Sequence, residues 1–190
     1  KNPLTPIQLT IDRLKTKYEK SIDVNEKENF KNYLKTVIKQ IKQIESLVNE
    51  FSDFARMPKP MLQNCNIIEI IKNNISLLRE FDENVSIKLN CKNSELFLKC
   101  DADQISRVFL NLIKNSIESI QEKSQKNGEF TKIIDIEILN NNDYITANIT
   151  DSGTGFPKEN IKNIIKPYFT TKPDGSGLGL SIVNKIINDH

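Results

Sequence analysis

The sequence predicts an α+β protein in which an N-terminal helical hairpin is followed by an α/β sandwich domain. Apolar residues at heptad spacing dominate the first part of the chain, and helical patterns interleaved with alternating apolar residues dominate the rest. Pro58 and Pro60 separate the two parts, because proline disfavours helix in the residue before it. We therefore expect one domain over residues 1–57 and a second over residues 58–190.

The first part carries the pattern of two amphipathic helices joined by a polar segment. Apolar residues recur in steps of three and four over residues 4–18, and over residues 30–55 they keep a period of about 3.5. Ile41 and Ile44 lie in the middle of this apolar seam, which is wider than a two-stranded coil needs. Two hairpins that pair through residues 4–55 into a dimeric four-helix bundle would cover it. The alternative is that both helices pack on the rest of the chain.

The second part alternates between helix and strand patterns. Helices are expected over residues 67–78, 101–124, 158–165 and 178–188, and strands around residues 85–89, 96–98, 134–138 and 144–150. Asn66 and Glu69 have the spacing of a capping box, with Asn in place of Ser or Thr. Helices interleaved with hairpin-like strands predict an α+β layer sandwich.

Composition and charge narrow the classes of protein. The net charge of +2 gives no support for a nucleic-acid partner or for an anionic membrane surface. No stretch approaches the roughly 18 consecutive apolar residues that span a bilayer. Cys65, Cys91 and Cys100 form no C-x-x-C pair, which favours buried thiols in a reducing compartment over a disulfide framework. The chain opens with Lys-Asn-Pro, so we expect it to be a piece of a longer protein.

Glycines are concentrated in two clusters near the C-terminus. The first, Asp151-Ser-Gly-Thr-Gly155, follows a predicted strand, and the second, Gly175-Ser-Gly-Leu-Gly179, precedes a predicted helix. Glycine is favoured where the backbone needs unusual dihedral angles or approaches a ligand. A carboxylate at a strand end can accept a hydrogen bond from an amine such as that of adenine, and free N–H groups at a helix N-terminus can bind phosphate. Either cluster alone could be a plain turn.

Two asparagines add a third polar element upstream. Asn111 and Asn115 lie four residues apart, on one face of a predicted helix. Asn is a mediocre helix former, so a pair on one face suggests a polar site. An amide oxygen is a ligand that Mg²⁺ accepts together with phosphate oxygens and water. The alternative is a solvated helix face.

Together these segments resemble the sensor histidine kinases, which share a wider family of ATPases with gyrase and MutL. Residues 111–116 resemble their N box, 151–155 the G1 box, 167–172 the F box and 175–179 the G2 box, in the same order and spacing. The opening KNPLTPI resembles the stretch after the phospho-accepting histidine of the dimerisation helix. Combined with PYFTTK, it most resembles NtrY-type nitrogen-regulation kinases, and the resemblance spans essentially the whole chain.

The resemblance implies an ATP-binding (Bergerat) domain that uses ATP and Mg²⁺. Asp151 would accept a hydrogen bond from the adenine amine, Asn115 would bind Mg²⁺, and Asn111 would lie near the phosphates. Gly153 and Gly155 would shape the adenine pocket. Phosphate oxygens would be held by backbone amides, and these amides with the metal would stabilise charge on the γ-phosphoryl group during transfer.

The resemblance also implies a mobile lid over about residues 170–177. Phe169 would anchor this lid, and Lys172 would be a phosphate contact. The nucleotide-binding residues expected here are Phe169, Thr170, Lys172, Gly175, Gly177, Leu178 and Gly179.

Two positions decide between related activities. The hydrolytic relatives carry a Glu where this chain has Asn111, and an amide cannot act as their general base. Phosphoryl transfer to a protein side chain is therefore expected rather than hydrolysis. Glu118 departs from the pattern, because many of these kinases have a basic residue there. The alternatives are an ATP-binding dimeric scaffold without turnover, or a response-regulator phosphatase in which Asn2 orients a water on an aspartyl phosphate.

The resemblance further implies a cognate response-regulator receiver domain as partner. It implies a cytoplasmic segment of a parent protein in the inner membrane, with no direct membrane contact here. The acceptor histidine is expected three residues before Lys1, so the chain alone is not expected to autophosphorylate. His190 is the single histidine, and we expect it to end a helix ahead of further strands.

Overall fold

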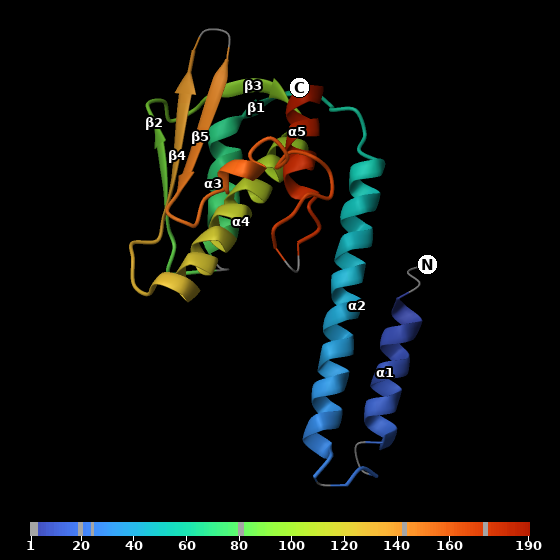
Figure 1. Cartoon of the computed structure of the whole chain (residues 1–190). Helices are drawn as coiled ribbons and strands as arrows, with labels where there is room; N and C mark the ends of the chain where they lie inside the picture. The colour runs from blue at the N-terminus through green and yellow to red at the C-terminus, as the bar shows by residue number, and fades with distance from the viewer. Residues whose placement is uncertain (1–3, 19–20, 24, 80–81, 142–143, 173–174) are drawn as a thin grey trace. The chain divides into compact units, whose positions relative to one another are not determined.

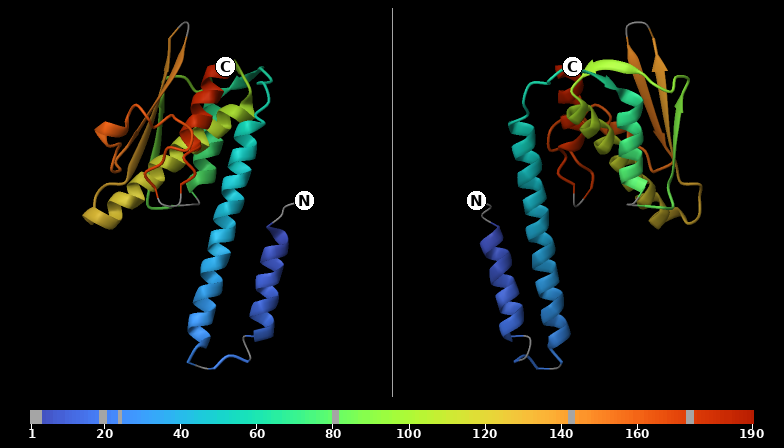
Figure 2. Two further views of the ribbon diagram at one scale, coloured as in Figure 1. Left: turned by 45° about the vertical axis from the view of Figure 1, so that its right-hand side comes forward. Right: turned by 180° about the vertical axis from the view of Figure 1, so that it is seen from behind.

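The computed structural model describes residues 4–18, 21–23, 25–79, 82–141, 144–172 and 175–190. They form two compact units, which Figures 1 and 2 colour along the chain. The first unit comprises Lys1–Met57 with Lys172–Ser176, and the second comprises Pro58–Thr171 with Gly177–His190.

The first unit is built on a helical hairpin. Its helices are α1 (Thr5–Tyr18) and α2 (Lys27–Ala55), and both views in Figure 2 show them side by side. Ile11 and Ile41 are the buried apolar residues described in these helices. Gln8 Nε2 also donates a hydrogen bond to Glu45 Oε2 over 3.5 Å, which ties α1 to α2. The predicted N-terminal hairpin is therefore confirmed.

A single hairpin leaves much of the apolar seam of α2 uncovered. Ile41 is only 6% exposed, whereas Ile44, expected beside it in the same seam, is 47% exposed. Other large apolar side chains of α2 are also exposed, namely Val37, Leu47, Val48 and Phe51. The two isoleucines therefore have different surroundings, because α1 is too narrow to cover the whole seam.

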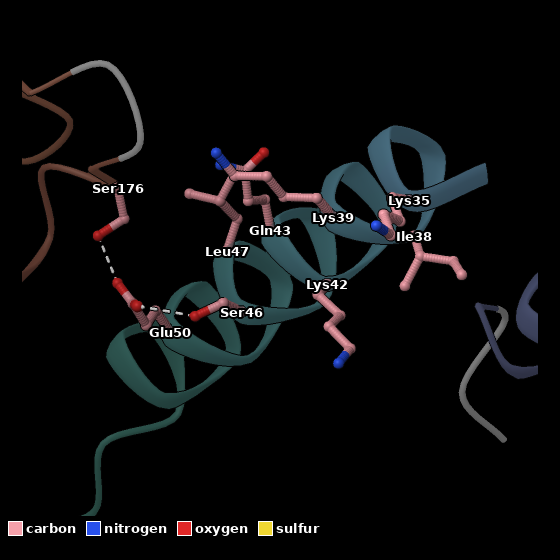
Figure 3. Close-up of a pocket in the computed structure, with 9 residues that line it drawn as sticks. All are labelled: Lys35, Ile38, Lys39, Lys42, Gln43, Ser46, Leu47, Glu50 and Ser176. Atoms are coloured by element: carbon pink, nitrogen blue, oxygen red, sulfur yellow. Dashed lines mark hydrogen bonds between the residues drawn. The ribbon is translucent and has the colours of Figure 1, made fainter. Parts of the chain in front are cut away.

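A pocket of about 480 Å³ lies along α2 within the first unit. Lys35, Lys39 and Lys42 line part of it (Figure 3). The Ser176 hydroxyl donates a hydrogen bond to one oxygen of Glu50, whose other oxygen lies 3.2 Å from Ser46 Oγ. Ser176 is therefore attached to α2.

The described residues of the second unit form two sheets and three long helices. A two-stranded antiparallel sheet pairs β1 (Gln63–Asn66) with β3 (Phe97–Cys100). A three-stranded sheet has the order β2 (Ser86–Cys91), β4 (Ile133–Asn140) and β5 (Ile145–Asp151). The helices are α3 (Ile67–Arg79), α4 (Ala102–Asn127) and α5 (Gly179–Asp189). This layered arrangement of helices on a sheet confirms the α+β class (Figure 1).

The pairing of strands places the end of β5 beside the start of β4, the central strand of its sheet. β4 pairs with β5 as an antiparallel hairpin, in a register that sets Asp151 opposite Ile134. β2 runs parallel to β4, which is possible because β3 and α4 form a long crossover between them. The core lies between β4 and the helices, and its fully buried isoleucines are Ile71, Ile113, Ile120, Ile134, Ile136, Ile182 and Ile186. α4 contacts α3, α5, β4 and β5, so it is the central support of this unit.

The start of α4 is also the attachment point of the segment that follows α2. Asp101 caps the helix, because its Oδ1 accepts a hydrogen bond from the Gln104 N–H over 3.1 Å. Its Oδ2 accepts a second bond from the Met61 N–H over 2.9 Å. Gln104 Nε2 donates to the Pro58 carbonyl over 3.0 Å. The bonds from Met61 and to Pro58 thus join residues 58–61 to the first turn of α4.

One helix expected from the sequence is corrected, and two features of the strands were not predicted. The helix expected over residues 158–165 is only a 3₁₀ turn, Lys158–Asn160, followed by further turns. The apolar residues of that segment do not form a buried face, since Ile161 and Ile165 are about half exposed. β1 was not predicted, because its sequence QNCN is polar and does not alternate. The strands around residues 85–89 and 96–98 also belong to different sheets, since β2 pairs with β4 and β3 pairs with β1.

The cysteines are free thiols, and only one of them is buried. Burial raises the pKa of the Cys100 thiol to about 12, and neighbouring Cys65 adds to the effect. Cys65 and Cys91 are half-buried, so the expectation of buried thiols holds for Cys100 alone. Among the described residues, none of the helices has the length and apolar composition that crossing a bilayer requires.

Candidate functional site

The asparagine face of α4 lies against the first residue of α5. A Cβ atom built on Gly179 would stand 3.1 Å from Asn111 Oδ1 and 3.9 Å from Asn115 Nδ2. Asn111 Nδ2 donates to the Arg107 carbonyl over 2.8 Å, and this bond leaves Oδ1 directed at Gly179. Both asparagines are half-buried. The structure therefore brings together the N-box asparagines and the last glycine of the second glycine cluster.

Leu178, the residue before α5, holds the start of this helix in place. This side chain is only 1% exposed, and its carbonyl accepts hydrogen bonds from Ile182 N and Ser181 Oγ, each over 2.8 Å. The first N–H groups of an α-helix have no partner within the helix, and they carry the positive end of its dipole. Beside the amide oxygen of Asn111, this end of α5 offers both donors and positive potential to an anion.

Gly177 is the last residue of the predicted lid. It has φ +69°, and a Cβ atom there would stand 2.5 Å from the Tyr168 carbonyl carbon. Tyr168 itself has φ 66°, which is unusual for a bulky residue and stores backbone strain. The backbone of Gly177 is thus closely packed against the backbone of Tyr168 and Phe169, the residues that precede the predicted lid.

The structure places the remaining predicted lid residues differently. Thr170 is exposed and follows Phe169 in the second unit. Lys172 and Gly175 belong to the first unit, with Ser176. Pro173 and Asp174 lie outside the described residues. Contact of Lys172 and Gly175 with phosphate therefore stays a prediction.

The loop after β5 carries the predicted adenine-binding carboxylate. Asp151 ends the strand, and its Oδ1 accepts a hydrogen bond from the Gly153 N–H over 2.9 Å. Gly153 has no room for a side chain, because a Cβ atom would stand 2.1 Å from Ser119 Oγ on α4. Gly155 has φ +70°, and a Cβ atom there would meet no described atom within 4 Å. Glycine is therefore required at position 155 by the turn rather than by packing.

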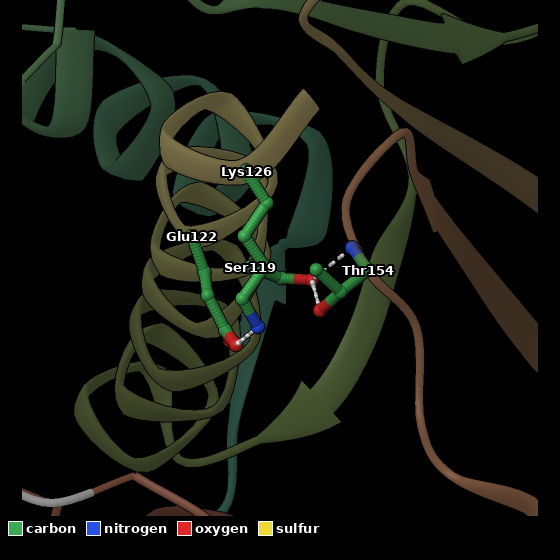
Figure 4. A network of polar contacts seen from close by, with 4 residues as sticks. All are labelled: Ser119, Glu122, Lys126 and Thr154. Carbon is green, nitrogen blue, oxygen red and sulfur yellow. Dashed lines mark hydrogen bonds and ion pairs between the residues drawn. The ribbon is translucent and has the colours of Figure 1, made fainter. Parts of the chain in front are cut away.

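Two residues of α4 hold this loop, and neither was predicted from the sequence. Ser119 Oγ accepts a hydrogen bond from the Thr154 N–H over 3.0 Å and lies 3.3 Å from Thr154 Oγ1 (Figure 4). Lys123 Nζ donates to the Ser152 carbonyl over 2.7 Å. Ser119 follows Asn115 by four residues, so extending the polar face of Asn111 and Asn115 by another turn would have found it.

Known proteins match both units. Residues 100–190 match the family described as "Histidine kinase-, DNA gyrase B-, and HSP90-like ATPase", and residues 1–60 match the "His Kinase A (phospho-acceptor) domain". The solved catalytic domain of the histidine kinase ThkA is 30% identical, with a TM-score of 0.59, over 67% of this chain and 80% of that chain. The chain belongs to the sensor histidine kinase family.

Longer relatives extend the comparison. A Rickettsia felis protein described as an NtrY-like sensor histidine kinase is 37% identical over 190 residues, which is all of this chain and 30% of that protein. This chain therefore spans less than a third of that relative. ThkA solved in complex with the response regulator TrrA is 26% identical, with a TM-score of 0.68, over 97% of this chain and 51% of that one. The resemblance to NtrY-type sensor kinases that the sequence motifs indicated is therefore confirmed.

Glu118, which departs from the residue type of many related kinases, lies near a lysine on the same helix. Glu118 Oε1 lies 4.0 Å from Lys114 Nζ, one turn earlier on α4. The Glu118 side chain is 35% exposed and that of Lys114 is 67% exposed. The basic charge that many family members carry at position 118 is thus present one helical turn away.

His190 has a structural role at the end of α5 of this kinase-family chain. The Asp101 N–H donates to His190 Nε2 over 3.0 Å, and His190 Nδ1 lies 2.8 Å from the Ile186 carbonyl. Nε2 must be the acceptor, so Nδ1 carries the proton in this arrangement. Asn2, the residue predicted for a phosphatase role, lies outside the described residues.

Proposed function

We propose that this chain is the kinase core of a sensor histidine kinase, which binds ATP with Mg²⁺ and transfers the γ-phosphoryl group to a histidine. The observation that carries the proposal is the contact of Asn111 and Asn115 with Gly179 at the start of α5. It brings the amide oxygen of Asn111, the amide nitrogen of Asn115 and the N–H groups at the start of α5 together around a residue without a side chain. The loop bearing Asp151 is attached to the same helix, α4.

Each group of the site has a distinct task in this proposal. Asp151 accepts a hydrogen bond from the adenine amine, and the N–H groups at the start of α5 donate to phosphate oxygens. Asn115 holds Mg²⁺ through its amide oxygen, a donor that this ion accepts. When bound, the ion neutralises part of the negative charge on the phosphate oxygens. The Asn111 amide is not basic enough to activate water, which favours transfer over hydrolysis.

The first unit supports a dimeric arrangement with a second copy of the chain. Exposed apolar residues follow one face of α2, and a partner hairpin in a four-helix bundle would cover them. The phosphoryl group would then pass from the acceptor histidine to an aspartate of a response regulator. That the parent protein lies in the inner membrane, with this segment on the cytoplasmic side, is part of the same proposal.

The proposal is tested by phosphoryl transfer in the parent protein that contains this chain. With γ-labelled ATP, we expect label that is lost in acid and retained in base, as for phosphohistidine. Asn115→Ala should abolish the label, whereas a substitution of exposed Tyr144, such as Tyr144→Ser, should not. ATP binding by the parent protein without any label would contradict the kinase assignment and leave the scaffold alternative.

A further inference from the structure

The loop of residues 151–155 is attached to α4 at two points one turn apart. Ser119 Oγ accepts from the Thr154 N–H over 3.0 Å, and Lys123 Nζ donates to the Ser152 carbonyl over 2.7 Å. Lys123 Nζ also lies 4.7 Å from the centre of the Phe130 ring, which restrains the lysine by a cation–π contact. At Gly153, between these two points, the loop backbone approaches Ser119 so closely that no side chain would fit.

These bonds determine what Asp151 can offer to a ligand. Its Oδ1 is occupied by the Gly153 N–H, and the Thr154 N–H is occupied by Ser119. Within the part of the chain that the structure describes, Asp151 Oδ2 makes no hydrogen bond to protein. Oδ2 is therefore the oxygen with its full accepting capacity left for an incoming amine, and its position depends on how the loop is held.

We propose that Ser119 and Lys123 are positioning residues for adenine recognition, acting through the loop rather than by touching the nucleotide. This inference rests on the proposed ATP-binding function and adds to it the groups that orient Asp151. The Ser119 hydroxyl fixes the loop at Thr154, and the Lys123 ammonium fixes it at Ser152. Because each contact engages backbone atoms of the loop, substitutions in the loop side chains leave both attachments in place.

The test measures ADP binding by calorimetry in the full chain. Ser119→Ala is expected to weaken ADP by about three- to tenfold, the equivalent of one net hydrogen bond. Lys123→Met is expected to have a similar effect, and Lys123→Arg should restore most of the affinity. Ser124→Ala is the matched control, because Ser124 lies on α4 and its buried hydroxyl has no hydrogen-bond partner among the described residues. It should bind ADP as the wild type does.

A double-mutant cycle separates positioning from general stability. If Ser119 acts through Asp151, Ser119→Ala should have little further effect once Asp151→Asn is present, whereas independent effects would add. Amide hydrogen exchange without nucleotide gives a second readout. Exchange at Thr154 should become faster in Ser119→Ala and stay unchanged in Ser124→Ala.

The outcomes distinguish this inference from the function on which it rests. Wild-type affinity for ADP in Ser119→Ala, or additive losses in the cycle, would overturn the positioning role while ATP binding stands. An equal loss of affinity in Ser124→Ala would also overturn it, because that variant leaves the loop attachments intact. If the wild-type chain binds no adenine nucleotide, the proposed function itself fails and the positioning role with it.

Discussion

The side-chain oxygen of Asn111 lies 3.1 Å from the point where a methyl group would stand on Gly179. Asn111 cannot easily move away, because its Nδ2 is bonded to the Arg107 carbonyl. Gly179→Ala should therefore displace the asparagine by a few tenths of an ångström and weaken ADP binding. The same change should not lower the melting temperature, since Gly179 is the first residue of α5 and Ala is a better helix former than Gly. Calorimetry measures the affinity for ADP, and thermal unfolding measures the melting temperature. A Gly179→Ala variant with unchanged affinity would contradict the prediction.

Gly177 and Gly155 offer a comparison of two glycines with the same backbone conformation. Both have φ near +70°, but only at Gly177 would a Cβ atom collide with neighbouring backbone, at Tyr168. Gly155→Ala should cost about 1–2 kcal/mol of unfolding free energy through its backbone conformation alone. Gly177→Ala should cost clearly more, because the neighbouring backbone of Tyr168 and Phe169 must also shift. Equal costs in denaturant unfolding would argue against the close packing at this point.

Substitutions in α2 should separate folding of the hairpin from association. Ile41 is buried within one chain, so Ile41→Ala should lower the unfolding free energy by about 2–5 kcal/mol. Ile44 and Val48 are half exposed, so their joint replacement by Ala should weaken the dimer with a smaller effect on the helices of one chain. Light scattering over a concentration series measures the association. A monomeric mass for the unaltered chain at high concentration would contradict the bundle.

Asp101 should make the stability of the second unit depend on pH. The hydrogen bond from the Met61 N–H is the largest cause that holds the pKa of Asp101 below its usual value; the Gln104 N–H bond acts in the same direction, and burial opposes both. Because the pKa is lower in the folded state, this stabilisation is present above the pKa of the unfolded state. It is lost as the pH falls through the folded-state pKa. Asp101→Asn should reduce the loss of stability in acid. Urea unfolding at a series of acidic pH values measures this effect. The same dependence of the unfolding free energy on pH in Asp101→Asn and in the wild type would contradict it.

The main elements of both units could be predicted from the sequence, because their apolar patterns are regular. Helical spacing is clear in the apolar seam of α2 and in the polar pair on α4. Strand spacing is clear in the alternation of Ile134, Ile136 and Ile138. Residues 158–165 also carry apolar residues at helical spacing, but no neighbouring described surface buries Ile161 or Ile165. A segment with apolar residues at helical spacing forms a stable helix only where other parts of the protein cover its apolar face.

The candidate site was predicted in its residue types but not in its supports. Asp151, Asn111 and the glycines form recognisable motifs, whereas Ser119 and Lys123 contact the backbone of a loop about thirty residues later in the chain. Such contacts depend on how β5 is placed against α4, which no local pattern encodes. The parallel pairing of β2 with β4 could not be predicted for the same reason.

Calorimetric titration of the chain with ATP and with GTP, in the presence of Mg²⁺, tests the central claim most directly. Asp151 should accept a hydrogen bond from the amine of adenine, whereas guanine presents a carbonyl there, so ATP should bind and GTP should bind poorly. A hydrogen bond to a charged group contributes about 1.5–3 kcal/mol, so Asp151→Asn should weaken ATP by roughly ten- to a hundredfold. Equal affinity for the two nucleotides, or ATP binding that is unchanged in Asp151→Asn, would contradict the account.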